Sequence, residues 1–462
     1  MFSLNNFGKR VARPVPPVPA PDCSRNMPEH INKILLFFVI SVTARGLYLC
    51  LFSNCHSADL VNWNRIGDLL LAGENPYKET GFLNWPPLWM QLIFLFKKIS
   101  LATHCSFFTV VRAFLILVEG VAGVLLYATL LRYTKFKNAA GLLIFGVALN
   151  PIAILQVCQQ CNFDVLVGFW VMLALYMLLR FQERQEARFW LFACLAIGMG
   201  IVTKTIPLCL QPLLLISARK LKLTEWIIGA ALTFTPMMLG LSIIYVLGPD
   251  DVETKVLGYR SIPGDFGLTG FLAYFQAGHL LKIYPRIFEI VYGAGWLGLG
   301  GWLLSKPALN VRQIVSIAAA LLLAIPAMGP GYNPEYVCWF LPLLLLLYGL
   351  EGRIIRGFLL GFYLVGAATY LVEYGLFWQT RGAFLLDIMQ NEKLLKFAND
   401  LYLPIHQTLL RLPLWILYFV AVAFLCARIA KDMVLDFKTP GSLITSRNLR
   451  SPGQMTTPEN PC

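Results

Sequence analysis

The sequence predicts an all-α, polytopic membrane protein with about twelve transmembrane helices. Of its 462 residues, 57% are hydrophobic and only 14% are charged, whereas a soluble chain carries about 25% charged residues. Apolar runs of roughly 20 residues, each long enough to cross a hydrocarbon core of about 30 Å, recur from Ile34 to Ala427. These runs are continuously apolar rather than alternating, which excludes a transmembrane β-barrel.

The two ends of the chain are predicted to be disordered cytoplasmic segments. Residues 1–33 contain the proline-rich run VARPVPPVPAP and no apolar core of the kind that a cleavable signal peptide needs. Residues 431–462 include the polar run TTPENPC. Residues 34–430 form the predicted transmembrane domain, and we expect no separate soluble domain.

Basic residues orient the predicted spans. The net charge of +13 is explained by Lys and Arg in cytoplasmic loops, where they are enriched in membrane proteins, rather than by a nucleic-acid site. The first span, about Ile34–Phe52, follows a basic N-terminal segment, so the loop of residues 53–106 is predicted to lie outside. The other long loops, residues 248–285 and 373–411, fall on the same side.

The apolar run Pro86–Ile99 is predicted to be an interfacial helix on the outer surface, because it is short for a span and ends in two lysines. If it crossed the membrane, the basic segment Arg132–Lys137 would lie outside, against the charge bias. The second span is therefore about Phe107–Tyr133. The remaining spans are about Ala139–Gln156, Phe163–Phe181, Phe189–Val202, Ile206–Ala218, Trp226–Leu247, Ile287–Leu304, Ile314–Met328, Val337–Leu350, Phe358–Val372 and Leu412–Ile429.

Two carboxylates of the first exterior loop are candidates for chemistry. The segment Asp59–Ala72 has the pattern of an amphipathic helix with an apolar side facing the membrane. At about 100° per residue, Asp59 and Asp68 lie on opposite sides of one continuous helix, so they are not a paired acid and base. Asp59 also fits a helix N-terminal carboxylate favoured by the helix dipole, and Asp68 fits a solvated residue paired with Arg65.

The same loop also carries turn residues and aromatic side chains. The run GENPY at residues 73–77 indicates a turn, and NWPPLW follows at residues 84–89. The prolines of the second run also fit an ordinary helix start, and Trp85 fits an interfacial aromatic belt. Each feature is common alone; their order within one loop is what indicates a function.

A second set of polar residues lies at the outer junction of two spans, in LNPIAILQVCQQCNFD at residues 149–164. It includes Gln160 and Asp164. Polar groups at this depth are costly unless they pair or line a wet cavity, although hydrogen bonding between helices also explains them. Cys158 and Cys161 form a C-x-x-C without a second Cys pair or a His at metal spacing, so no metal site is predicted.

Cations near the outer face form a third set. Lys204, in IVTKTIP, lies between two short apolar segments. It fits a snorkelling lysine, and its ammonium also stands at the level of a lipid-carrier phosphate. Arg45, inside the first span, needs a partner or an aqueous cavity. Arg260 and Arg381 are further exterior cations.

The region from about Ile34 to Ala430 resembles the GT-C superfamily, integral-membrane glycosyltransferases that use polyprenyl-phosphate sugars. It looks closest to the bacterial group that includes polyprenyl-phosphate-mannose-dependent family 87 enzymes. The matching features, in order, are Asp59 soon after the first span, GENPY, NWPPLW, the 149–164 segment, Lys204 followed by Pro207, and PEYVCWFLPLLL at Pro334–Leu345.

The resemblance implies that Asp59 is the catalytic carboxylate. Many relatives carry an acidic pair or an Asp-x-Asp in this loop, whereas this chain has Asp59-Leu60-Val61; a divalent metal is possible but no motif supports it, and no cofactor is expected. A sugar phosphate brings its own leaving group, so one carboxylate can deprotonate the acceptor hydroxyl during an inverting attack. The expected substrate-binding residues are Lys204 for the phosphate, with Arg260 or Arg381 as weaker candidates, Tyr77 and Trp85 for sugar faces, Gln160 and Asp164 for hydroxyls, and Asp68.

The predicted activity is transfer of a hexose, with mannose favoured, from a polyprenyl-phosphate-sugar donor to a lipid-linked or glycan acceptor on the exterior membrane face. Two other functions remain open at this point. An O-antigen-type polymerase or ligase would use a lipid diphosphate-linked glycan, and a transporter of lipid-linked oligosaccharides would not need Asp59. The bacterial plasma membrane is the favoured location, and the endoplasmic reticulum membrane is the alternative.

Overall fold

The computed structural model describes residues 27–438, with gaps at 52–56, 81–82, 84, 135, 217, 248–254, 257–266, 307, 332–333 and 373–403. Every regular element in this part of the chain is helical. The fold-class prediction of an all-α membrane protein is therefore confirmed. The predicted disordered ends lie largely outside the described residues, as do most of the predicted loops 248–285 and 373–411.

The helices follow one another with short connections in the described ranges. The first half contains α1 (Met27–Leu51), α2 (Ala58–Leu71), α3 (Pro76–Glu79), α4 (Pro87–Thr103), α5 (Phe107–Tyr133), α6 (Ala139–Leu143), the π-helix η1 (Ile144–Ala148), α7 (Pro151–Cys158), α8 (Asp164–Arg184) and α9 (Ala187–Thr203). The second half contains the 3₁₀ helices η2 (Ile206–Leu215) and η3 (Ala218–Lys220), then α10 (Leu223–Leu247), α12 (Gly267–Tyr274), α13 (Gly278–Leu304), α14 (Val311–Met328), η5 (Pro334–Tyr336), α15 (Val337–Leu350), α16 (Arg353–Val372) and α19 (Pro404–Lys438).

Seven of the described helices are long and apolar enough to cross a membrane by themselves, namely those within α1, α5, α8, α10, α13, α14 and α19. The α6–η1 and α7 segments form a further, bent pair with an angle of 45° between its halves. Four shorter apolar helices lie in α9, η2, α15 and α16. Together these elements match the predicted spans one for one, although the shorter ones do not reach the length of a straight span.

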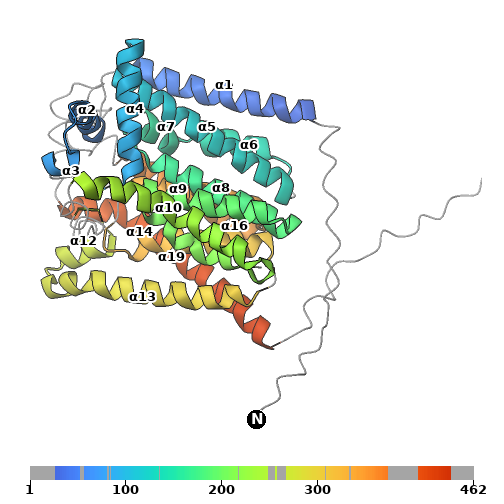
Figure 1. The fold of residues 1–462 in the computed structure, drawn as a ribbon. Helices are drawn as coiled ribbons and strands as arrows, with labels where there is room; N and C mark the ends of the chain where they lie inside the picture. The colour runs from blue at the N-terminus through green and yellow to red at the C-terminus, as the bar shows by residue number, and fades with distance from the viewer. Residues whose placement is uncertain are drawn as a thin grey trace, which may run out of the picture.

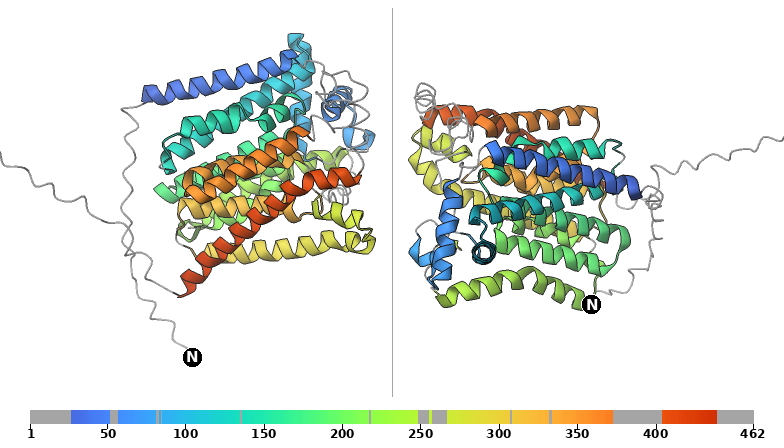
Figure 2. Two further views of the ribbon diagram at one scale, coloured as in Figure 1. Left: turned by 180° about the vertical axis from the view of Figure 1, so that it is seen from behind. Right: turned by 90° about the horizontal axis from the view of Figure 1, so that it is seen from above.

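The long helices run side by side, and α4 lies across one end of the bundle (Figure 1). The helix α2 lies across the same end in another direction, as the second view from above confirms (Figure 2). The segment predicted to be interfacial, Pro86–Ile99, is thus a helix that does not follow the direction of the spans. Both helices belong to the loop predicted to be the first exterior one, and they cover the end of the bundle where the candidate residues gather.

Several predicted boundaries differ from the structure. The helix α1 begins at Met27 and α19 runs from Pro404 to Lys438. Residues 27–33 and 431–438 of the predicted disordered ends and residues 404–411 of a predicted loop are therefore helical.

The helix α13 begins at Gly278, inside the predicted loop 248–285, and that loop also contains α12. The predicted span Ile206–Ala218 is mostly the 3₁₀ helix η2, which contains Pro207 and Pro212. Proline lacks the N–H that an α-helix would use and clashes with the preceding turn, so this segment forms the tighter helix instead.

The core contains a buried ion pair between α1 and α5. The guanidinium of Arg45 is fully buried and pairs with the carboxylate of Glu119. It also donates hydrogen bonds to the carbonyl oxygens of Ser41 (3.1 Å) and Ala148 (3.0 Å). Of the two predicted alternatives for Arg45, a partner or an aqueous cavity, the structure shows a partner, and this partner is the lone acidic residue of the second span.

Glycines bring two pairs of spans into backbone contact. A Cβ atom on Gly168 of α8 would lie 2.8 Å from the carbonyl oxygen of Cys338 in α15. A Cβ atom on Gly198 of α9 would overlap the carbonyl oxygen of Leu232 in α10. Small residues allow such close approach between membrane helices, so α8, α9, α10 and α15 form a tightly packed block.

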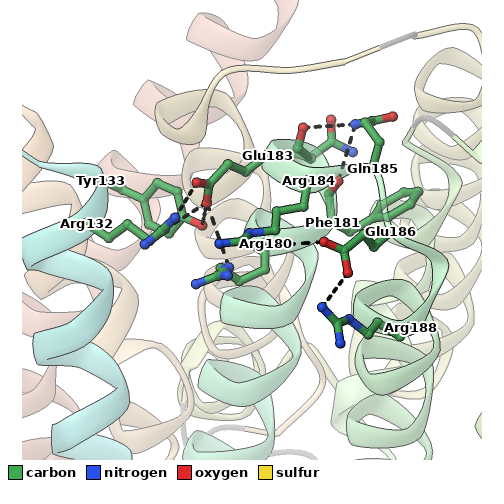
Figure 3. A network of polar contacts seen from close by, with 10 residues as sticks. Arg132, Tyr133, Arg180, Phe181, Glu183, Arg184, Gln185, Glu186 and Arg188 are labelled. Atoms are coloured by element: carbon green, nitrogen blue, oxygen red, sulfur yellow. Dashed lines mark hydrogen bonds and ion pairs between the residues drawn. The ribbon is translucent and has the colours of Figure 1, made fainter. Parts of the chain in front are cut away.

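Basic residues gather at the end of the bundle opposite α2 and α4. There Arg132 of α5 pairs with Glu183 of α8, and Arg188 of α9 pairs with Glu186 at 2.5 Å (Figure 3). The sequence assigned this end to the cytoplasm because of the charge bias.

Candidate functional site

The start of α2 lies directly on the connection between α7 and α8. Ser57 is the N-cap of α2, and its hydroxyl oxygen accepts a hydrogen bond from the N–H of Leu60 at 3.1 Å. The same hydroxyl donates to the carbonyl oxygen of Gln160 at 2.7 Å. A serine N-cap fixes where the helix begins, so this residue places Asp59, which follows two positions later, over the outer ends of the spans.

An ion pair between α8 and the end of α9 forms the centre of the site. The ammonium of Lys204 lies 2.7 and 3.0 Å from the two carboxylate oxygens of Asp164. The Asp164 side chain is fully buried, and that of Lys204 is 19% exposed. The backbone N–H of Asp164 donates to Oδ1 of Asn162 at 2.9 Å. Asp164 begins α8, where the helix dipole favours a negative charge.

Three aromatic rings surround the Lys204 ammonium. Its Nζ atom lies 5.5 Å from the ring centre of Phe163 and 4.9 Å from those of Tyr336 and Trp339. The Tyr336 and Trp339 rings stack on each other at 3.9 Å. The negative faces of aromatic rings attract a cation at these distances. Asp164 and this cage together hold Lys204 as a fixed positive charge.

The charges of Lys204 and Asp164 both act on the carboxyl group of Asp59. Burial raises the pKa of its carboxyl to about 6, while the Lys204 ammonium lowers the pKa and the Asp164 carboxylate raises it. These influences place the three groups within electrostatic range of one another, although they come from three separate segments. A carboxylate with a pKa near neutrality is suited to accept a proton from a hydroxyl group.

Gln160 links the connection between α7 and α8 to α16, and its side-chain NH₂ group is left unpaired among the described residues. The hydroxyl of Tyr370 in α16 donates to its side-chain oxygen at 2.6 Å. Its side-chain nitrogen is buried without a hydrogen-bond partner in the described part of the chain. A buried donor of this kind is costly to leave unpaired. The arrangement fits the predicted role of Gln160 as a donor to a sugar hydroxyl.

The two aromatic residues of the first exterior loop lie in different surroundings. The ring of Tyr77 is only 2% exposed, and its hydroxyl donates to the carbonyl oxygen of Trp85 at 2.7 Å. The buried Tyr77 ring offers little surface on which a ligand could stack, so we expect this residue to position Trp85. Trp85 is partly exposed, and its ring packs edge-on against Phe163 at 5.6 Å.

The apolar side of α2 also differs from its prediction. Leu60, Trp63 and Ile66 are fully buried, so this side packs on protein and not on the membrane. The ring of Trp63 lies 5.0 Å from that of Trp89 in α4. The sequence pattern is the same for both situations, because protein interior and lipid are equally apolar.

Asp68 lies away from the site, as its position on the helix predicts. Its side chain is 60% exposed and pairs with Lys97 of α4 at 2.8 Å, not with Arg65. Lys97 also donates to the side-chain oxygen of Asn64 at 2.7 Å. Asp68 thus links α2 to α4, and on this geometry we no longer expect it to bind substrate.

The two arginines predicted as weaker candidates for binding phosphate, Arg260 and Arg381, lie outside the described residues. Sequence reasoning missed Tyr336 and Trp339 as individual site residues, although it singled out the segment that contains them. It also missed Lys255, whose ammonium donates to the carbonyl oxygens of Tyr77 and, at 3.3 Å, Thr80.

Within the described ranges, no three His, Cys, Asp or Glu side chains come together in a way that could hold a metal ion. Asp59 and Asp164 supply two carboxylates, and Lys204 already neutralises one of them. The arrangement thus offers a proton acceptor beside a buried cation, a pair of groups suited to acid–base and phosphate chemistry.

A stretch of the chain that includes two of these residues matches a known protein family. Residues 85–244 match the family model described as dolichyl-phosphate-mannose-protein mannosyltransferase. The matched region contains Asp164 and Lys204 but begins after Asp59. No curated protein matches the chain. The family match covers residues 85–244 of the 462. Together with the helical membrane fold, it supports a multi-pass integral membrane protein with glycosyltransferase activity of the GT-C type.

Proposed function

We propose that this glycosyltransferase moves a hexose, with mannose favoured, from a polyprenyl-phosphate-sugar donor to a lipid-linked or glycan acceptor on the exterior membrane face. The observation that carries the proposal is the grouping of Asp59 with the Asp164–Lys204 ion pair at one end of the bundle. The donor class is further supported by the family description, which names a dolichyl-phosphate-mannose substrate for the matched proteins.

In the proposed reaction Asp59 accepts the proton of the acceptor hydroxyl. The hydroxyl oxygen forms a bond to the anomeric carbon while the bond between that carbon and the phosphate oxygen breaks. The phosphate leaves with the bonding electrons, and the sugar configuration inverts. General-base catalysis of this kind contributes about 10²–10⁴-fold to the rate, and the leaving phosphate needs no general acid.

Lys204 is proposed to stabilise the leaving phosphate. Its ammonium has three N–H donors, and two of its contacts go to the carboxylate oxygens of Asp164. The aromatic cage keeps the cation poorly hydrated, so its interaction with an arriving phosphate oxygen is stronger than in water. Asp164 then orients Lys204, and Gln160 and Trp85 are left to contact the sugar.

The acceptor and the membrane belong to the proposal as well. The description of the matched family names a protein acceptor, which makes a membrane-protein fraction a useful second acceptor beside a lipid extract. The bacterial plasma membrane is proposed as the location, with the endoplasmic reticulum membrane as the alternative.

The test is sugar release and transfer by the purified protein from synthetic polyprenyl-phosphate-mannose and polyprenyl-phosphate-glucose. Crude lipid extract and membrane-protein fraction serve as separate acceptor sources. The wild type should turn over the mannose donor, and Asp59→Asn should lose about 10²-fold or more. Asp68→Asn, which changes the exposed carboxylate of the same helix, is the matched control and should keep wild-type turnover. Equal rates for wild type and Asp59→Asn would remove Asp59 from the role of base.

A further inference from the structure

A polar cavity lies at the opposite end of the bundle from the glycosyltransferase site. Its volume is about 130 Å³, enough for several water molecules, each of which occupies about 30 Å³ in the liquid. Side chains of α13, α14 and α19 line it, and they include Trp302, Arg312, Ser316 and Arg428. The ends of these helices put the cavity at the membrane boundary that the charge bias assigns to the cytoplasm.

Two arginines stand at this cavity with a shared carboxylate behind them. Glu351 is buried. Its Oε1 accepts hydrogen bonds from Nε of Arg312 at 2.7 Å and from a terminal nitrogen of Arg428 at 2.5 Å, and its Oε2 accepts one from a terminal nitrogen of Arg312 at 2.5 Å. Among the described side chains, one carboxylate faces two guanidinium groups, so a net positive charge remains. Each guanidinium carries five N–H donors in a rigid fork, and Glu351 fixes the direction of both forks.

The other polar groups around the cavity are also donors. The hydroxyl of Ser316 and the indole N–H of Trp302 are buried, and neither has a hydrogen-bond partner in the described part of the chain. Asn310 and Gln313 form a capping box at the start of α14, in which each side-chain oxygen accepts a backbone N–H. The oxygen of Asn310 is thus occupied, and the group that it offers to the cavity is its NH₂ donor.

Donors that converge from all sides call for an acceptor with several oxygens. Two buried donors without partners are costly in an empty or purely apolar cavity. The start of α14 adds the positive end of a helix dipole, which favours an anion at the same place. Basic pockets between membrane helices at the cytoplasmic boundary bind lipid headgroups.

We propose that this cavity binds a phosphate group, that of an anionic phospholipid in the cytoplasmic leaflet. Arg312 and Arg428 contact the phosphate oxygens, and Ser316 and Trp302 complete its hydrogen bonds. The site is separate from the glycosyltransfer chemistry and holds α13, α14 and α19 together where they leave the membrane. The proposal does not depend on the donor or acceptor of the enzyme.

The test uses the purified full-length chain with defined lipids. Thermal stability and native mass spectrometry are measured with phosphatidylglycerol, with phosphatidylcholine and with inorganic phosphate. Phosphatidylglycerol should raise the melting temperature of the wild type more than phosphatidylcholine does, and it should remain bound in the mass spectrum. Arg312→Gln should weaken apparent binding by about tenfold, the effect of losing one charge-assisted hydrogen bond.

Milder variants and a control keep the test decisive. Trp302→Phe and Ser316→Ala each remove one donor but keep the packing, and each should reduce the stabilisation. Arg188→Gln changes a 64% exposed arginine at the same end of the bundle, and it should respond to lipid as the wild type does. Equal responses of the wild type, Arg312→Gln and Ser316→Ala would overturn the site. Stabilisation by inorganic phosphate equal to that by phosphatidylglycerol would overturn the lipid as its source.

Discussion

Lys204 and Asp164 form a bidentate contact across 40 positions of the chain, with Nζ 2.7 and 3.0 Å from the two carboxylate oxygens. The contact joins the start of α8 to the end of α9. It means that the cation proposed to meet the donor phosphate is already held in place before the donor binds. A charge that is fixed in advance stabilises a developing negative charge without having to reorganise.

The pair should behave as a unit in a double-mutant cycle. Lys204→Met leaves the fully buried Asp164 carboxylate without its partner, and removing one partner of a buried pair costs about 3–5 kcal/mol. The double variant Asp164→Asn/Lys204→Met should recover most of that stability but none of the activity. Melting temperatures and turnover of the wild type, the two single variants and the double variant check this. Additive losses of stability would show that the two side chains do not depend on each other.

The rate should depend on the ionisation of Asp59. A base is active when it is deprotonated, so kcat/KM should rise with pH through about 6, the pKa to which burial raises this carboxyl, and then level off. Lys204 lowers this pKa and Asp164 raises it. Lys204→Gln should therefore move the inflection to higher pH, and Asp164→Asn should move it to lower pH. An unchanged inflection in both variants would assign the titration to another group.

The same pKa has a consequence for stability. Because the pKa of Asp59 is raised above its unfolded value, the folded state is penalised when this carboxyl ionises. The penalty is absent well below pH 4, develops up to about pH 6 and is complete above it. Asp59→Asn should thus melt at or above the wild-type temperature at pH 8 while it loses activity. A lower melting temperature at pH 8 would contradict the raised pKa.

Tyr77 and Trp85 should give separable effects. Tyr77→Phe removes only the hydrogen bond to the Trp85 carbonyl, so it should cost about 1 kcal/mol of stability and change KM little. Trp85→Ala removes the partly exposed ring beside Phe163, so it should raise the KM for a sugar substrate more than it lowers the melting temperature. Steady-state kinetics with both variants decide this. A larger KM effect from Tyr77→Phe would return Tyr77 to the sugar-binding role.

The Arg45–Glu119 pair should make a large contribution to the stability of the folded protein, because it joins the first two spans. Glu119→Gln leaves a fully buried guanidinium charge without its counter-ion, and we expect a loss of about 3–5 kcal/mol. The exposed Lys33–Glu29 pair of the same helix is the matched control. Lys33→Met should cost about 1 kcal/mol or less. Size-exclusion profiles after heating compare the two variants, and similar melting behaviour would refute the distinction.

The spans and several site residues were predictable because their signals are local. A continuous apolar run marks a span wherever it occurs, and the helical period places Asp59 and Asp68 on opposite sides of α2. Because an unpaired charge inside an apolar run is costly, the position of Arg45 likewise predicts a partner or an aqueous cavity. These arguments need only composition, length and the geometry of one helix.

The remaining features depend on which segments meet, and a single sequence does not show this. Asp164 and Lys204 were each candidates, but nothing in their spacing pairs them. Tyr336 and Trp339 surround Lys204 only because α15 packs beside α8. The partner of Asp68 is Lys97 from another helix, whereas helical spacing favoured Arg65. The burial of the Tyr77 ring and of one side of α2 follows from the same tertiary packing.

The glycine contacts at Gly168 and Gly198 have a consequence for how such an enzyme diverges. They leave no space for a side chain between the backbones of α8 and α15 or of α9 and α10. The spacing of the charged pair is thus determined inside the bundle, because Gly168 lies about one helical turn from Asp164 and Gly198 lies less than two turns from Lys204. If the proposed function holds, changes in the loops can therefore alter which sugar or acceptor is bound without disturbing the charges proposed to act on the phosphate. Recognition and reaction can evolve at different rates within one chain.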